Sequence, residues 1–144
     1  MLRRGDYVLC NFPFRESRGP GPSPHVVLCA ATGGEGDVSF AIVFYTTSQT
    51  DYQGTRRPQQ YLFVNKARAT ELGQKVAFHV DASRIARLPL TTDYFPELGD
   101  KTVRVIRRDP DFVIKVEKRL RELVAAGFGI VKVDAVQDHQ SRPR

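Results

Sequence analysis

A stretch near the N-terminus combines strand-like alternation with a loop that excludes helix. Residues 7–12 alternate at the two-residue period of a β-strand, and residues 25–31 form a second, strongly apolar strand. The loop between them, Arg15 to Ser23, carries Pro20 and Pro22. Proline lacks the backbone donor that a helix or a regular ladder needs. Because both faces of the first strand are apolar, it fits one strand of a small closed barrel better than a one-sided sheet.

The rest of the chain continues the β-rich pattern. Residues 32–37 are glycine-rich and predict a turn, and residues 66–72 predict a short helix that ends at Gly73. Further strands are expected at residues 38–46, 61–64, 75–80, 83–90, 102–107 and 130–133. The segments 75–80 and 83–90 meet at Asp81, where the carboxylate is expected to start a turn by accepting backbone hydrogen bonds.

One longer helix is expected near the C-terminus, over about residues 110–126. Asp109 is a suitable N-cap, Pro110 suits the first helical position, and Gly127 ends the segment. Its apolar stripe, expected to pack on the sheet, consists of Phe112, Val113, Val116, Leu120, Leu123 and Val124. The fold class is therefore mainly β (α+β), a small antiparallel barrel with a C-terminal helix. We expect a single domain over residues 1–133 and a disordered tail over 134–144.

Composition places the chain among cytosolic proteins that need no cofactor. The 144 residues suffice for one buried core, and neither a membrane-spanning apolar run nor a signal peptide is visible. Cys10 and Cys29 fall in predicted strands and are read as reduced core thiols. His79 and His139 have no partner ligands at metal-binding spacing, so no metal site is predicted.

The charge balance favours a polyanionic partner. The net charge is +6, from 22 basic and 16 acidic residues. Most of the basic residues are arginines, whose guanidinium pairs bidentately with phosphate and stacks on bases. A solvated basic surface explains charge alone equally well, and an acidic protein is a third possible partner.

Three motifs in order along the chain resemble the PemK/MazF toxins. The first runs from Gly5-Asp6 through Phe12-Pro13-Phe14 to Pro24-His25-Val26-Val27-Leu28. The second is Tyr45-Thr46-Thr47-Ser48-Gln49, similar to the family's "Thr-Ser-Gln" at a strand end. The third, residues 80–89, resembles "Phe-Asp-Leu-Ser-Arg-Ile" followed by "Leu-Pro". Together they cover about residues 4 to 126, and each alone is a weak signal.

This resemblance implies a fold, an activity and partners. Members of the family are SH3-like barrels with a C-terminal helix, homodimeric, and act as metal-independent endoribonucleases in toxin–antitoxin pairs. The resemblance therefore implies cleavage of single-stranded RNA to 2′,3′-cyclic phosphate and 5′-hydroxyl ends. It also implies a cognate antitoxin whose disordered tail covers the RNA groove.

The resemblance also implies the site residues, with one departure. Thr47 occupies the position of the family's catalytic threonine, with Ser48 following, whereas Ser23 stands where the family has a catalytic arginine. A serine hydroxyl brings no positive charge to the phosphorane, and losing such a contact costs about 3–4 kcal/mol of barrier. Without the family context, the Thr47-Ser48 pair would be read as a turn cap.

Several side chains are candidates to bind RNA or to supply the missing charge. They are Arg15 and Arg18 in the first loop, His25, Gln49, and Arg56 and Arg57 in the polar loop 49–60. Tyr45 and Tyr52 are candidate stacking surfaces for splayed bases. The enzyme hypothesis competes with a non-catalytic module of the same fold that binds RNA or an antitoxin tail. An attenuating change at Ser23 is a further alternative.

Overall fold

The computed structural model describes residues 2–13, 19–48, 59–96 and 105–136. It contains seven strands and two helices in these parts of the chain. In chain order they are β1 (Asp6–Cys10), β2 (His25–Glu35), β3 (Val38–Thr47), β4 (Tyr61–Val64), α1 (Lys66–Glu71), β5 (Phe78–Pro89), β6 (Val105–Arg108), α2 (Pro110–Ala125) and β7 (Val131–Asp134). The prediction of a mainly β protein with a C-terminal helix is confirmed.

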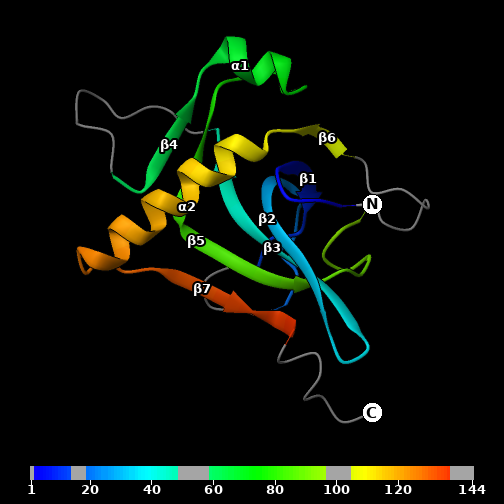
Figure 1. Cartoon of the computed structure of the whole chain (residues 1–144). Coiled ribbons are helices and arrows are strands. Elements are labelled where there is room, and N and C mark those ends of the chain that lie inside the picture. The colour runs from blue at the N-terminus through cyan, green and yellow to red at the C-terminus, as the bar shows by residue number, and fades with distance from the viewer. Residues whose placement is uncertain (1, 14–18, 49–58, 97–104, 137–144) are drawn as a thin grey trace.

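The strands form one curved sheet in the order β4-β5-β3-β2-β1-β6. All five pairings along this path are antiparallel, and β7 adds a parallel pairing to β5. Figure 1 shows α2 crossing the curved sheet and β7 running beside β5. Within the described residues the sheet is an open path, so closure into a barrel stays a prediction.

Two apolar cores lie on the two faces of the sheet. On β1, Val8 and Cys10 belong to one core while Tyr7 belongs to the other. On β3, Val43 and Phe44 divide in the same way. Successive side chains of a strand point to opposite faces, so a strand that is apolar on both faces is buried on both. The interpretation of this stretch as a strand with two buried faces is confirmed for β1, which ends at Cys10, two residues before the expected end.

The two helices follow their capping signals. In α1 the Asn65 side chain accepts from the Arg68 amide at 2.8 Å, and Gly73 follows the helix at φ 79°. In α2 the cap is Asp109, with Pro110 in the first turn. Its buried residues Val113, Val116 and Leu123 pack in the core that also contains Tyr7, as predicted. Val124 is 58% exposed, so its place in the buried stripe was wrong: at its position the stripe has already turned away from the sheet.

The turn expected over residues 32–37 is present, but it is confined to residues 36 and 37. Strand β2 continues to Glu35, and the chain reverses only at Gly36, where φ is 61°. Gly33 pairs with Phe40, and a Cβ at Gly33 would lie 2.8 Å from the Phe40 ring. The glycine therefore makes room for a ring packed over the strand, a second use of glycine that composition does not distinguish from a turn.

The strands predicted at 75–80 and 83–90 are one element, β5. It pairs with β3 through His79 and Val80 and again from Ile85 to Pro89, with an irregularity between the two stretches. At this irregularity Asp81 Oδ1 accepts from the Ser83 amide at 2.9 Å and from the Ser83 hydroxyl at 2.6 Å. The local turn chemistry expected of Asp81 is present, but it bends a continuous strand and does not separate two strands.

The described structure continues beyond residue 133, where the domain was expected to end. Ala135 and Val136 are buried, and Asp134 forms an ion pair with Arg87 at 2.7 Å. These residues belong to the domain because β7 carries them onto the sheet. The rest of the expected tail, residues 137–144, lies outside the described residues.

Neither described helix is long and apolar enough to cross a membrane.

Candidate functional site

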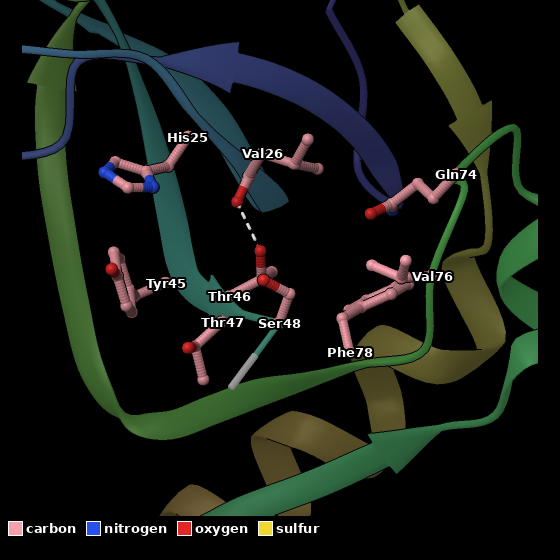
Figure 2. Close-up of a pocket in the computed structure, with 9 residues that line it drawn as sticks. All are labelled: His25, Val26, Tyr45, Thr46, Thr47, Ser48, Gln74, Val76 and Phe78. Carbon is pink, nitrogen blue, oxygen red and sulfur yellow. Dashed lines mark hydrogen bonds between the residues drawn. The ribbon is translucent and has the colours of Figure 1, made fainter. Parts of the chain in front are cut away.

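A pocket of about 430 Å³ lies where β2 begins and β3 ends. Nine residues line it: His25, Val26, Tyr45, Thr46, Thr47, Ser48, Gln74, Val76 and Phe78. Figure 2 shows the β2 and β3 residues on one side of this space and the segment from Gln74 to Phe78 on the other. The pocket brings together three segments that are separated in the sequence.

The end of β3 supplies the hydroxyl groups of the pocket. Thr46 is buried and donates its hydroxyl to the Val26 carbonyl at 2.5 Å, which ties the end of β3 to the start of β2. Thr47 is the last residue of the strand and pairs with His79 on β5, and Ser48 follows it with an exposed side chain. Thr46 is thus a structural tie, while Thr47 and Ser48 bring hydroxyls to the pocket wall.

The opposite wall begins with Gln74, a residue that the sequence interpretation missed. The turn that ends α1 brings it there: Gly73 has a positive φ, and the Gln74 amide donates to the Ala69 carbonyl at 2.8 Å. The Nε2 atom of Gln74 is buried and has no hydrogen-bond partner among the described residues. A buried amide donor without a partner costs free energy, and because the atom is buried, a ligand oxygen in the pocket reaches it only after the Gln74 side chain turns. The only sequence signal was a polar residue after a helix-ending glycine.

An aromatic cluster borders the pocket around Tyr45. The Tyr45 ring lies 5.2 Å from the Phe12 ring and 5.7 Å from the His25 ring, measured between centroids. Arg84 of β5 places its guanidinium carbon 4.2 Å from the Tyr45 centroid and 5.2 Å from that of Phe12. Both distances are within the range of cation–π contacts. Arg84 was not among the residues predicted to bind RNA.

Four of the predicted site residues meet in this pocket, and one does not. His25, Tyr45, Thr47 and Ser48 all line it. Ser23 is exposed and precedes β2, outside the lining residues. The other candidates lie outside the described residues: Arg15, Arg18, Gln49, Tyr52, Arg56 and Arg57.

The described wall of the pocket combines polar and apolar residues and carries no lysine or arginine. Among the described residues, no group of three His, Cys, Asp or Glu side chains is placed to hold a metal ion. The nearby Asp81 is only 7% exposed, and burial raises the pKa of its carboxyl, while the hydrogen bonds from Ser83 and the charge of Arg84 oppose that rise. Asp81 therefore serves the β5 bend and is committed to Ser83.

Comparisons with known proteins leave the family open. No protein-family model matches the chain, and no curated protein matches it either. Any functional assignment therefore depends on the arrangement of the pocket residues.

Proposed function

We propose that the chain is a PemK/MazF-like toxin, a metal-independent endoribonuclease that cleaves single-stranded RNA in the cytoplasm. The observation that carries the proposal is the meeting of His25, Thr47, Ser48 and Gln74 in one pocket. An imidazole, two hydroxyls and an amide with an unpaired donor are groups that can transfer protons and donate hydrogen bonds to a phosphate. The basic composition supports an RNA substrate.

The chemistry that these groups support is internal transfer of the phosphodiester. The ribose 2′-oxygen attacks the adjacent phosphorus while its proton passes to His25, an exposed residue on the pocket rim. The bond from phosphorus to the 5′-oxygen breaks, and that oxygen takes a proton from solvent. Thr47, Ser48 and Gln74 donate hydrogen bonds to the non-bridging oxygens, where charge develops. The products carry a 2′,3′-cyclic phosphate and a 5′-hydroxyl.

The second candidate is a binding module of the same fold that cuts nothing. One observation favours it: the described lining residues include no arginine or lysine, and Ser23 is an exposed hydroxyl. A pocket without a cation stabilises a dianionic phosphorane poorly but still accommodates a ligand. Under this alternative the site holds RNA or the tail of an antitoxin.

The test is cleavage of a long labelled RNA in the presence of EDTA. We expect the parent to cut and Thr47→Ala to lose at least tenfold in rate, with 5′-hydroxyl ends among the products. Thr32→Ala is the matched control, because Thr32 is an exposed threonine on β2 outside the pocket. RNA with 2′-O-methyl groups throughout should resist cleavage, since the nucleophile is blocked.

The same assay separates the two candidate functions. Cleavage by Ser23→Arg alone, with an inactive parent, would establish a site that binds and lacks the charge needed to cut. Equal cleavage by the parent and Thr47→Ala would contradict a catalytic role for the pocket.

The proposal includes a homodimer and an antitoxin as partners. Several large apolar side chains are exposed on the single chain and would be available to a second copy: Phe63, Val76, Ile114, Val124 and Phe128. Light scattering on the purified chain measures the oligomeric state, and a monomer at micromolar concentration would contradict the dimer.

A further inference from the structure

Arg84 differs from four other described arginines of the fold, because its guanidinium contacts aromatic rings and pairs with no described carboxylate. Those four form ion pairs with carboxylates: Arg4 with Glu117, Arg68 with Glu71 and Asp109, Arg87 with Glu35 and Asp134, and Arg108 with Asp6. Within the described residues Arg84 contacts the rings of Tyr45 and Phe12, and its charge also acts on the Asp81 carboxyl without forming an ion pair. No described carboxylate lies within ion-pair distance of it.

The ring contacts hold the cation without consuming its hydrogen-bond donors. A cation–π contact uses the charge of the guanidinium and needs none of its five N–H groups. Tyr45 and Phe12 therefore fix the position of Arg84 and leave its planar fork available. This fork matches two oxygens of one phosphate.

The bend in β5 explains why Arg84 reaches this position. On β3 only Tyr45 lies between Phe44 and Thr46, whereas residues 81–84 lie between their partners Val80 and Ile85 on β5. The extra residues form the bend that Ser83 and Asp81 stabilise by two hydrogen bonds. The last of them is Arg84, which is thereby placed over Tyr45. Tyr45 lines the pocket, so the guanidinium lies against a residue of the pocket wall, although Arg84 itself is not a lining residue.

We propose that Arg84, stacked on Tyr45, is the phosphate-binding cation of this site, and that it supplies the charge that Ser23 does not. The ligand class is single-stranded RNA: one phosphate lies against the guanidinium while a neighbouring nucleotide occupies the pocket. This inference rests on the proposed function for the choice of ligand, but it concerns binding and does not require cleavage. The exposed imidazole of His25, beside Tyr45, offers a further edge for the same nucleotide.

The test measures binding of a fluorescent, fully 2′-O-methylated single-stranded RNA by anisotropy over a series of salt concentrations. This probe cannot be cut, so a failure of the ribonuclease proposal leaves the measurement intact. We expect Arg84→Gln to raise Kd about tenfold, the size of one charge-assisted contact. The slope of log Kd against log salt should fall by about 0.7, the contribution of one phosphate contact in a single strand.

Two further variants separate a specific contact from general charge. Arg121→Gln removes the same charge from the exposed face of α2 and should change Kd less than twofold. Arg84→Lys keeps the charge and loses the fork, so it should retain the salt slope and bind with intermediate affinity. Thermal unfolding of each variant checks that the fold is retained.

A measurement on the unaltered chain covers the case in which Arg84→Gln does not fold. Phenylglyoxal modifies accessible guanidinium groups, and peptide mass mapping reports the rate at each site. Bound probe should protect Arg84 at least fivefold and leave Arg121 unprotected.

Three results would overturn the inference. They are equal effects of Arg84→Gln and Arg121→Gln, no binding of the probe by the parent, and no protection of Arg84. Loss of an acidic peptide's binding in Arg84→Gln, with RNA binding unchanged, would also reject RNA as the ligand.

Discussion

Replacing Gly5 by alanine tests how β1, β2 and α2 are joined. Gly5 has φ 92°, donates its amide to the Cys29 carbonyl at 2.8 Å and accepts from the Asp109 amide at 2.8 Å. A Cβ at this position would lie 2.6 Å from the nitrogen and 2.7 Å from the Cα of Pro110. These are backbone atoms of the first turn of α2, so relief requires a shift of the helix.

The expected loss of stability has two parts. A non-glycine residue at positive φ costs about 1–2 kcal/mol. Displacing a well-packed element to remove a steric overlap costs a further 1–3 kcal/mol or so. We therefore expect Gly5→Ala to lower the free energy of unfolding by about 2–5 kcal/mol, a large fraction of the roughly 5–15 kcal/mol typical of a domain.

Two other glycines provide matched controls in urea unfolding followed by circular dichroism. Gly127 has φ 76° but open space around its Cβ position, so Gly127→Ala should cost only the backbone part, about 1 kcal/mol. Gly129 has open space and no positive φ, so Gly129→Ala should change stability by less than about 0.5 kcal/mol or increase it slightly. If Gly5→Ala and Gly127→Ala cost the same, the contact with Pro110 carries no energy and the reasoning fails.

Three further predictions concern the core and its charges. Burial raises the pKa of Cys10 above its ordinary range and that of Cys29 to about 12. Both buried thiols should therefore resist labelling by a thiol reagent at pH 8 until urea unfolds the chain, and rapid labelling of the folded chain would contradict this. The paired arginine lowers the pKa of Glu117, so this carboxylate stabilises the fold above its unfolded pKa and loses the effect as pH falls through its folded pKa. Glu117→Gln should accordingly cost about 0.5–1 kcal/mol at pH 7 in urea titrations, with a difference from the parent that vanishes in acid. By the same method Leu123→Ala should cost about 2–5 kcal/mol of unfolding free energy and Val124→Ala under about 0.5, because only Leu123 is buried. Equal costs for the two variants would contradict the assignment of Leu123 to the buried face of α2.

Local patterns were sufficient for the elements whose start and end are chemically marked. Strand β4 and helix α1 were predicted within a residue of their bounds, and Asp109-Pro110 predicted the start of α2. Caps and strand alternation act between residues a few positions apart, so they can be read from sequence. Where a residue type has two uses, the local signal failed: Gly33 makes room for the Phe40 ring, and Asp81 bends a strand that continues.

The candidate site divides in the same way. The motif at the end of β3 and the residue that opens β2 pointed to Thr47, Ser48 and His25, and the fold brings these three to one pocket. Gln74 carries no motif, and its amide faces the pocket only because the α1 turn leads into β5. The RNA-binding roles expected of the loop arginines stay predictions, since those residues lie outside the described parts of the chain.

The class of fold, the position of the terminal helix and the hydroxyl-bearing strand end can be predicted from the sequence, because they depend on short-range periodicity and capping. The cation that stands near the pocket is specified only by the way the strands pair in three dimensions. Arg84 lies 39 positions from Tyr45 in the chain. Strands β3 and β5 pair on both sides of Tyr45, and the bend formed by residues 81–84 lies opposite this tyrosine. Arg84 contacts Tyr45 because it is the last residue of that bend. Long-range pairing of this kind is fixed by the packing of the whole sheet, and no local pattern specifies it.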